Sequence, residues 1–466
     1  MTLIILVTFA LLCTAVVLIS PKVGALLLGP IIFVYPHLYM ERQNLLPWNI
    51  GVDDLFICLL FVVVVIRRNL FGGVPLRLGL TVCGAIIYYL IWVMAQFSGW
   101  YVSPELTPIE VLKPILKGII FVLYAYVLVH TIDDERDLRR MAAAMTFVMT
   151  AAACTVILHR LFPAQFAIFS AERFERLRIS AGQVERGVGS LMSPNTGAAL
   201  LAMIVLFTIH IRRLVGSTTR LLTFACIPVL LIGMTFTGSR TGGLALGAAV
   251  GLMAIVSRSR VYAWGLCGLV LIGIFLRPDV VLVYWERLTQ AYNPDAGEIG
   301  ETGTSRMWAW QQYILTATPQ VWLFGEGQAS PLLRIGLNAH STYIAALFYH
   351  GILGLVWLIT FFGIMVRRSF RLAACPHEPY RSIGAAVLWA LLVWAIAGLA
   401  IDMLVTFSPH FMYLFFAAMI ERSYALARQR GLLTAALSSR VTLPVNDSAN
   451  NRIPRHAGAV GIPSRA

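Results

Sequence analysis

Charged residues are scarce in this chain of 466 amino acids. They make up 12% of the sequence, against about 25% in an ordinary soluble domain. Lysine is rarer still and occurs only at positions 22, 113 and 117. The sequence also lacks a G-x-x-x-x-G-K-[ST] loop and a G-x-G-x-x-G between a strand and a helix, which argues against a pump driven by nucleotide hydrolysis.

Cysteine is also sparse, with seven residues in the whole chain. They form no C-x-x-C pair and no clustered spacing, and most lie inside apolar runs. We therefore expect small core residues rather than disulfides or zinc ligands at Cys13, Cys58, Cys83, Cys154, Cys226, Cys267 and Cys375.

Apolar residues predominate: 59% of the chain is hydrophobic and its mean hydropathy is +0.79. Runs of about 20 apolar residues recur, which is the length that a helix needs to cross a bilayer. The pattern predicts an all-α, polytopic integral membrane protein with about 12–13 transmembrane helices. The predicted spans are 2–20, 23–40, 50–66, 79–97, 113–131, 141–162, 196–211, 219–237, 241–257, 261–276, 341–366, 383–401 and 404–421.

The lower helix count is an alternative because only Ser20, Pro21 and Lys22 separate the first two spans. The N-terminus has neither the basic head nor the small-residue cleavage site of a secretory signal, so we expect the first span to be retained. We predict a membrane domain over 1–422 and a polar cytoplasmic tail over 423–466 that is largely disordered.

The net charge of +14 comes from arginines scattered among short loops. Retention of positive loops in the cytoplasm explains this charge more simply than nucleic-acid binding does. The arginine-rich loops alternate consistently between the spans, at Arg67, Arg68, Arg77, Arg136, Arg139, Arg140, Arg212, Arg213, Arg220, Arg258, Arg260, Arg367, Arg368, Arg371, Arg422, Arg428 and Arg430.

Two longer segments, 163–195 and 277–340, fall on the opposite, periplasmic side in this assignment, and both contain arginines. A solvated loop is the default interpretation of each one, because long loops are translocated largely regardless of charge. Arg240 differs, since it lies in a very short connection at the membrane boundary, where it either extends to lipid phosphate or meets an anion. The planar donors of arginine suit phosphate oxygens, so we favour a polyprenyl diphosphate as the partner.

His340 ends the second long segment and is followed by Ser341 and, after nine residues, by Gly351-Ile352-Leu353-Gly354. On a continuous helix, Tyr343 lies one turn from His340, and the two glycines share a face that lets another helix approach closely. A histidine can accept a proton at neutral pH. A hydrogen-bonded helix cap is the alternative interpretation of His340, and we expect His350 to be a core residue.

Other charged residues on this side have two interpretations. Asp53 and Asp54 open the third span, where capping of the helix end is favoured over metal binding because adjacent side chains point apart. Lys113 and Lys117 are one turn apart at the start of the fifth span, where they are candidates for a secondary phosphate contact.

Three motifs in order carry a family resemblance that covers about 180 to 360: "SPNTGAALLAM", "TGSRTGG", and "GTSRMWAWQQYILTATPQVWLFGEG" followed by H-S-x9-G-x-x-G. Together they resemble the bacterial O-antigen ligase and polysaccharide polymerase superfamily. Members of that family are inverting glycosyltransferases of about twelve helices, with a GT-C-like membrane fold. They work at the periplasmic face of the inner membrane, and move a glycan from undecaprenyl diphosphate to an acceptor hydroxyl.

The resemblance implies a catalytic base at His340 and diphosphate-binding arginines at Arg240 and Arg306, with Arg186 a weaker match. Ser341 and Tyr343 are candidates for orienting the histidine or the substrate, although packing is favoured for Tyr343. No metal or cofactor is implied, because arginines can stabilise the leaving diphosphate. Many relatives have two threonines after the second glycine, where this chain has Leu355 and Val356, so the subfamily stays open.

Several functions remain as alternatives. A ligase would pass the glycan to lipid A core, and a repeat-unit polymerase would pass it to another lipid-linked glycan. Transfer to protein is less favoured, because such relatives usually have a longer periplasmic C-terminal region. From another class, a secondary transporter also fits the helix count, but paired broken helices and symmetric halves, which are typical of transporters, are not evident.

Overall fold

The structure is a computed structural model that describes residues 15–34, 51–68, 78–163, 165, 188–191, 193–214, 216–257, 264–265, 267–268, 271, 304–335, 339–404 and 407–433. Within these residues the chain forms helices and no strand. Eight of the helices in the described ranges are long and apolar enough to cross a membrane. The all-helical, multi-pass membrane class is therefore confirmed.

The first half of the bundle contains α2 (Pro21–Phe33), α4 (Val52–Arg67), α5 (Leu80–Val102), α6 (Pro108–Thr131), α7 (Glu135–Leu161), the short η4 (Gly189–Leu191) and α9 (Pro194–Ile211). The second half contains α10 (Ser217–Phe236), α11 (Arg240–Ser257), α14 (Thr304–Thr316), α15 (Pro319–Phe324), α16 (Ala329–Ile335), α17 (Thr342–Ala373), α18 (Tyr380–Ala397) and α19 (Phe407–Gln429). The predicted spans coincide with these helices, except that 2–20 and 261–276 lie largely outside the described residues. The last helix also continues past the predicted domain boundary at 422.

Four helices start at a proline that follows serine or threonine. The pairs are Ser20-Pro21, Thr107-Pro108, Ser193-Pro194 and Thr318-Pro319. Proline suits the first helical position because its missing N–H would have no partner there, and a hydroxyl in front of it can cap the exposed N–H groups. This local signal sets the start of α2, α6, α9 and α15.

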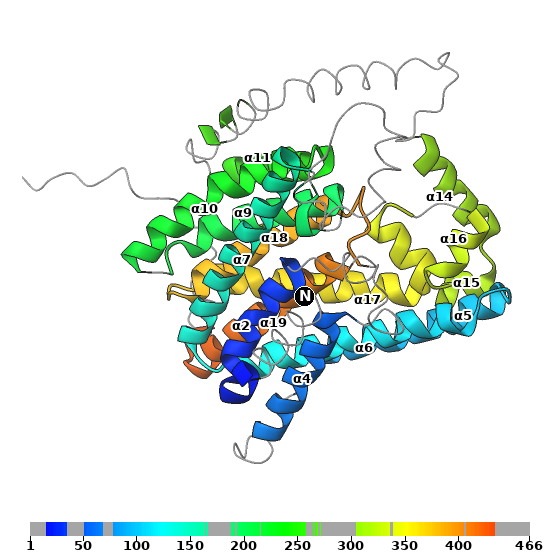
Figure 1. The fold of residues 1–466 in the computed structure, drawn as a ribbon, viewed down its shortest axis with the longest axis horizontal. Coiled ribbons are helices and arrows are strands. Elements are labelled where there is room, and N and C mark those ends of the chain that lie inside the picture. Colours follow the sequence, from blue (N-terminus) through cyan, green and yellow to red (C-terminus); the bar gives the residue numbers. More distant parts are fainter. Residues whose placement is uncertain are drawn as a thin grey trace, which may run out of the picture.

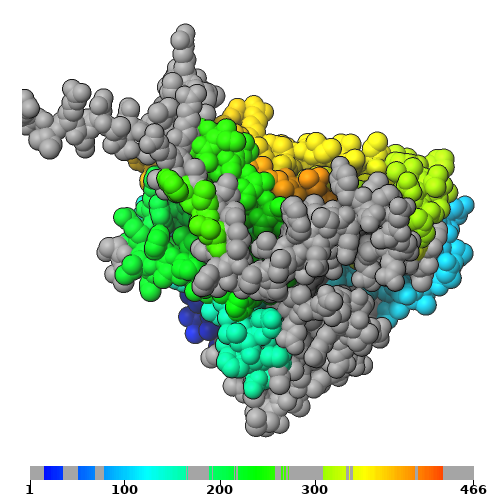
Figure 2. All heavy atoms as spheres, turned by 90° about the horizontal axis from the view of Figure 1, so that it is seen from above, coloured from blue at the N-terminus to red at the C-terminus, as the bar shows by residue number. Residues whose placement is uncertain are grey.

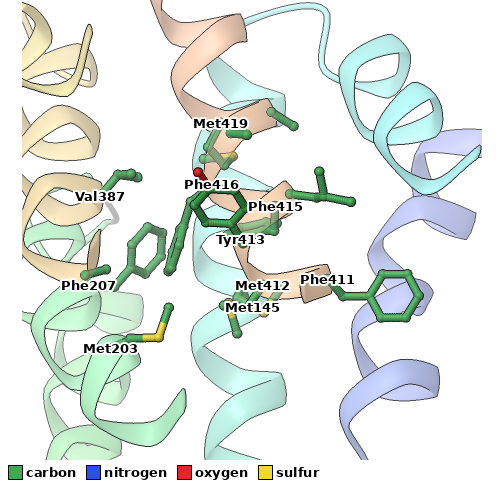
Figure 3. Packing of buried hydrophobic residues seen from close by; sticks show 14 of the residues in the cluster. Met145, Met203, Phe207, Val387, Phe411, Met412, Tyr413, Phe415, Phe416 and Met419 are labelled. Atoms are coloured by element: carbon green, nitrogen blue, oxygen red, sulfur yellow. The ribbon is translucent and has the colours of Figure 1, made fainter. Parts of the chain in front are cut away.

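Helix α9 lies at the centre of the molecule. Its apolar stretch of 18 residues is 83% buried inside the protein, compared with 28% for the apolar stretches of α10 and α11. It packs against α7, α10, α11 and α18, while α10 and α11 leave much of their surface for lipid. Figure 3 shows this core from close by, with Phe207 of α9 pointing toward Phe416 of α19 and Val387 of α18 nearby. The ring centroids of Phe207 and Phe416 are 5.4 Å apart.

One end of the bundle is held by basic side chains around the turn between α6 and α7. Lys22 and Arg68 reach the Asp133 carboxylate at 3.0 and 2.9 Å, and Arg422 donates to the backbone oxygen of Ile132 at 2.7 Å. Nearby, the N–H of Thr81 at the start of α5 donates to Glu421 of α19 at 2.6 Å. We call this the arginine-rich end.

The other end is the one at which α7 finishes. Helix α7 starts at the arginine-rich end, where Glu135 pairs with Arg430. Near its far end the Nδ1 of His159 accepts the backbone N–H of Val188, just before η4 and α9. Helix α9 therefore starts at the far end, and so does α11, because Gly242 packs directly against Ala198 there.

Helix α17 starts at this far end too. Tyr380, the first residue of α18, lies next to Glu135 at the arginine-rich end, so α18 finishes at the far end. The N–H of Thr342 at the start of α17 donates to the oxygen of Gly398, just past the end of α18, at 2.8 Å. We call the end where α9, α11 and α17 begin the His340 end.

Three short helices cover one side of the His340 end. Helices α14, α15 and α16 gather next to the end of α5, whereas α10 and α11 lie on the other side of the molecule (Figure 1). Figure 2 shows the yellow helix α17 between the green helices and the yellow-green ones. The second long segment thus returns to the bundle through α14–α16 before it reaches His340.

Helix α17 is broken inside. Gly351 has φ 68 and ψ −175, which interrupts the helix between His350 and Ile352. The prediction of one continuous helix with Gly351 and Gly354 on a shared face is therefore wrong. Close approach does occur at Gly351: a Cβ there would lie 2.2 Å from the backbone oxygen of Leu323, near the end of α15, and 2.7 Å from the backbone nitrogen of Gly325 in the turn after it. The positive φ of Gly351 makes room for these backbone atoms.

Candidate functional site

His340 stands just outside the start of α17 in a strained conformation. Its φ is 48°, and it is the one non-glycine residue with positive φ in the part of the chain that the structure describes. A left-handed backbone is costly for a residue with a Cβ and persists only where its surroundings hold it. The side chain is exposed at the surface of the His340 end. Such strain at an exposed ionisable residue is typical of a functional position.

The residue before His340 is held from both sides. The indole Nε1 of Trp310 donates to the backbone oxygen of Ala339 at 2.7 Å, and the Ala339 N–H donates to the Tyr349 hydroxyl at 2.9 Å. That hydroxyl lies 3.3 Å from the hydroxyl of Tyr313. Both backbone groups of Ala339 are therefore fixed, by α14 on one side and by α17 on the other.

The residues after His340 are bound to the end of α18. The Thr342 hydroxyl donates to the oxygen of Ile401 at 2.8 Å and accepts the N–H of Met403 at 3.0 Å. The buried Ser341 hydroxyl donates to Gly398, and the Tyr343 hydroxyl donates to Ala395 at 2.9 Å. Ser341 and Tyr343, which the sequence predicts as secondary site residues, thus join α17 to α18. Their contacts position the backbone that carries the histidine.

Arg240 is the first residue of α11 and is half-buried. The turn before it uses Gly238, with φ 61, and Thr237, whose hydroxyl accepts the N–H of Ser239 at 3.1 Å. The hydroxyl of Ser239 is buried and has no hydrogen-bond partner among the described residues. A guanidinium and a helix N-terminus therefore occur together at Arg240, and both attract anions.

The N-termini of α9, α11 and α17 lie at the His340 end. All three helices pack against α18. Neither Ser193 before α9 nor Ser341 before α17 makes a side-chain capping bond. The N–H groups of a first helical turn carry a partial positive charge, so this end favours anionic ligands beyond the charge of Arg240 itself. The structure thus brings His340 and Arg240 to one end of the bundle.

Lys117 already has an anionic partner. Its ammonium pairs with the carboxylate of Asp54, which also accepts the N–H of Gly51 at 2.8 Å. Asp54 therefore caps the start of α4, in agreement with the capping interpretation, and the pair engages one of the two lysines offered for a phosphate contact. Lys113 lies one turn before Lys117 in α6 and is half-buried. Among the described residues, no group of three or more His, Cys, Asp or Glu is placed to hold a metal ion.

The other two arginines of the predicted site cannot be placed at the level of side chains. Arg306 lies in the first turn of α14, and its side chain is outside the described residues. Arg186 lies wholly outside them. Both therefore stay predictions.

Sequence reasoning missed Trp310, Tyr349 and Asp402. Asp402 is half-buried between Ile401 and Met403, the residues that bind Thr342, and its carboxylate accepts the N–H of Leu404 at 3.1 Å. A carboxylate in this connection is the kind of group that orients an imidazole. Nothing in the sequence distinguishes these residues from the many aromatic and loop residues around them, because their roles come from contacts across helices.

Comparison with known proteins adds no family. No protein-family model matches the chain, and a search of curated proteins finds no significant match.

Proposed function

We propose that this protein is an inverting glycosyltransferase that moves a glycan from undecaprenyl diphosphate to an acceptor hydroxyl at the periplasmic face of the bacterial inner membrane. The observation that carries the proposal is the presentation of His340. It is exposed, strained and held on both sides by hydrogen bonds, at the end of the bundle where Arg240 and the N-termini of α9, α11 and α17 favour an anion. The resemblance of the motifs around both residues points to the same chemistry.

In the proposed reaction, an imidazole nitrogen of His340 takes the proton from the acceptor hydroxyl. The acceptor oxygen then attacks the anomeric carbon of the donor sugar, and the bond from that carbon to the diphosphate oxygen breaks. The electron pair of that bond leaves with the diphosphate. Because this is a single direct displacement, attack and departure lie on opposite faces of the sugar and the configuration inverts. Arg240, Arg306 and Arg186 would stabilise the departing charge, which is largest in the transition state.

The ligase form is favoured, with lipid A core as the acceptor, and the repeat-unit polymerase of the same superfamily is the alternative. Deletion of the gene separates the two. If long glycan chains accumulate on the carrier lipid, the protein is a ligase; if only single repeats remain, it is a polymerase.

A secondary transporter is the second candidate, and the broken helix α17 is the observation that favours it. Transporters often bind substrate at discontinuous helices, and Gly351 interrupts α17 beside the buried residues Glu326 and His350. Reconstituted protein should transfer glycan from the lipid-linked donor in a vesicle assay. Accumulation of a solute in the vesicles without any transfer would favour the transporter.

His340→Ala tests the catalytic assignment directly. Loss of a general base typically costs about 10²- to 10⁴-fold in rate, so we expect transfer to fall by at least 100-fold while the protein stays folded in the membrane. The matched control is His377→Ala, because His377 is also exposed but lies between α17 and α18 at the arginine-rich end. Near-normal transfer by His340→Ala would refute the role of His340 as base.

A further inference from the structure

One face of α5 carries a buried row of hydrogen-bonding side chains. Tyr88, Trp92 and Gln96 follow one another at intervals of four residues, so they lie on the same face of the helix. Their exposed fractions are 2%, 4% and 3%. Helix α5 packs here against α15 and α17. A polar row of this kind inside a membrane protein needs hydrogen-bond partners, because lipid offers none.

His350 faces this row from α17. Its Nε2 lies 3.0 Å from the Tyr88 hydroxyl, and the centroid of its ring lies 5.2 Å from that of Trp92. His350 is 1% exposed and is the last residue before the break in α17. The break thus places an imidazole against the polar face of α5.

The turn after α15 closes the same region from a third side. Gly327, with φ 66, donates its N–H to the oxygen of Tyr349, next to His350. A Cβ at Gly327 would lie 2.7 to 3.0 Å from the amide group of Gln96. The amide of Gln96, the indole of Trp92 and the imidazole of His350 therefore lie in one buried region between α5, α17 and this turn.

Three nitrogen atoms in this region have no hydrogen-bond partner among the residues that the structure describes. They are the Nε1 of Trp92, the Nε2 of Gln96 and the Nδ1 of His350. Nearly all buried polar atoms in proteins are hydrogen-bonded to protein or to bound water. Three such atoms from two helices, gathered at one place, indicate a shared partner.

We propose that Trp92, Gln96 and His350 form an internal binding site for a single water molecule. Trp92 and Gln96 each offer an N–H donor. If Nε2 of neutral His350 donates its proton to the Tyr88 hydroxyl, Nδ1 is an acceptor. One water accepts from the two donors and donates to Nδ1, so it satisfies all three atoms. This inference does not depend on the proposed glycosyltransferase function.

The bound water joins α5 to the first part of α17. That part runs from Thr342 to His350, so His340 precedes one end of it and the water site lies at the other. The site therefore fixes the inner end of this helical segment, and the strained His340 directly precedes its outer end.

The sign of a stability change tests the proposal. Gln96→Met keeps the length of the side chain and removes the amide. If the site is dry, the variant removes an unpaired buried donor and the melting temperature should rise; if the site holds water, the water loses a partner and the melting temperature should fall. Gln311→Met, at an exposed position of α14, should leave it unchanged. A rise in Gln96→Met would overturn the proposal.

A second measurement uses the unaltered protein. Short X-ray pulses split bound water into hydroxyl radicals, which oxidise side chains next to it even where bulk solvent is excluded. We expect oxidation at Trp92 and Tyr88, detected by mass spectrometry, and its loss from Trp92 in Gln96→Met. Phe207 and Phe416 are controls, because both are 0% exposed and pack against other apolar side chains (Figure 3). Labelling of Trp92 no greater than that of these two residues would contradict the water site.

Discussion

At the scale of single residues, the hydrogen bonds around Ala339 explain how one exposed histidine can be held in a costly conformation. A left-handed residue costs about 1–3 kcal/mol, and several bonds to its neighbours are needed to offset that cost. Trp310, Tyr349 and Thr342 supply those bonds from α14 and α17. Trp310 and Tyr349 are positioning residues, because they act on His340 through the backbone.

Trp310→Phe should lower the rate of glycan transfer and change the melting temperature little. The aromatic ring is kept, but the bond from the indole to the Ala339 oxygen is lost, so the imidazole shifts from its working position. A displacement of about 1 Å can cost about 100-fold in rate. We expect kcat to fall while KM for the donor stays near its normal value.

The matched control for this variant is Trp308→Phe, because the side chain of Trp308 is 49% exposed on the same helix. Equal activity of the two variants would show that the indole of Trp310 does not position the histidine.

At the scale of helices, the break in α17 is the feature that shapes the site. Gly351 adopts a backbone conformation that other residues rarely reach, and the turn between α15 and α16 occupies the space next to it. Gly325 and Gly327 in that turn also have positive φ, and their N–H groups bind the backbone of α15 and α17. Three glycines thus let two chain segments meet without side chains between them.

Gly351→Ala should destabilise the protein by about 1–3 kcal/mol or more, because the added methyl group needs a disfavoured φ and would meet Leu323. Gly363→Ala in the same helix is the control. In the part of the chain that the structure describes, no atom lies within 4 Å of a Cβ at Gly363, so alanine there should stabilise the helix by about 0.5–1 kcal/mol. Thermal unfolding of both variants in one detergent measures the difference. A Gly351→Ala protein as stable as the parent would mean that the break is not required.

Much of the helical pattern could be predicted because hydropathy and helix starts are local signals. Runs of apolar residues mark the spans, and pairs such as Thr107-Pro108 mark where a helix begins. The break at Gly351 could not be predicted, since Gly-x-x-Gly has the same spacing in a continuous, closely packed helix. His340 and Arg240 were found by motif, whereas Trp310 acts through a contact between residues 29 positions apart. Contacts of that range leave no periodic trace in a single sequence.

At the scale of the whole molecule, the two ends differ in kind. Ion pairs and hydrogen bonds from Lys22, Arg68 and Arg422 hold the arginine-rich end together around the turn between α6 and α7. The His340 end is held mainly by hydrogen bonds between backbone and neutral side chains, and it presents helix N-termini. The Lys117–Asp54 pair at the starts of α6 and α4 is the ion pair described at this second end.

Labelling of introduced cysteines tests the orientation of these ends. Glu105 and His377 are both exposed, the first in the connection from α5 to α6 at the His340 end and the second between α17 and α18 at the other. In a variant without natural cysteines, a thiol reagent that cannot cross the membrane should label Glu105→Cys in intact spheroplasts and His377→Cys only after lysis. The reverse result would place the His340 end in the cytoplasm and refute the proposed periplasmic reaction.

Helices α14 and α15 expose Trp308, Leu315 and Trp322 by 49%, 76% and 38%. Aromatic and leucine side chains on an outer helical face suit the boundary between lipid and water. The same α14 bears the indole that holds Ala339. The choice of detergent therefore affects His340 indirectly. A detergent that covers this exposed apolar surface poorly would loosen α14, and specific activity would then depend on the amphiphile even where the bundle itself stays intact.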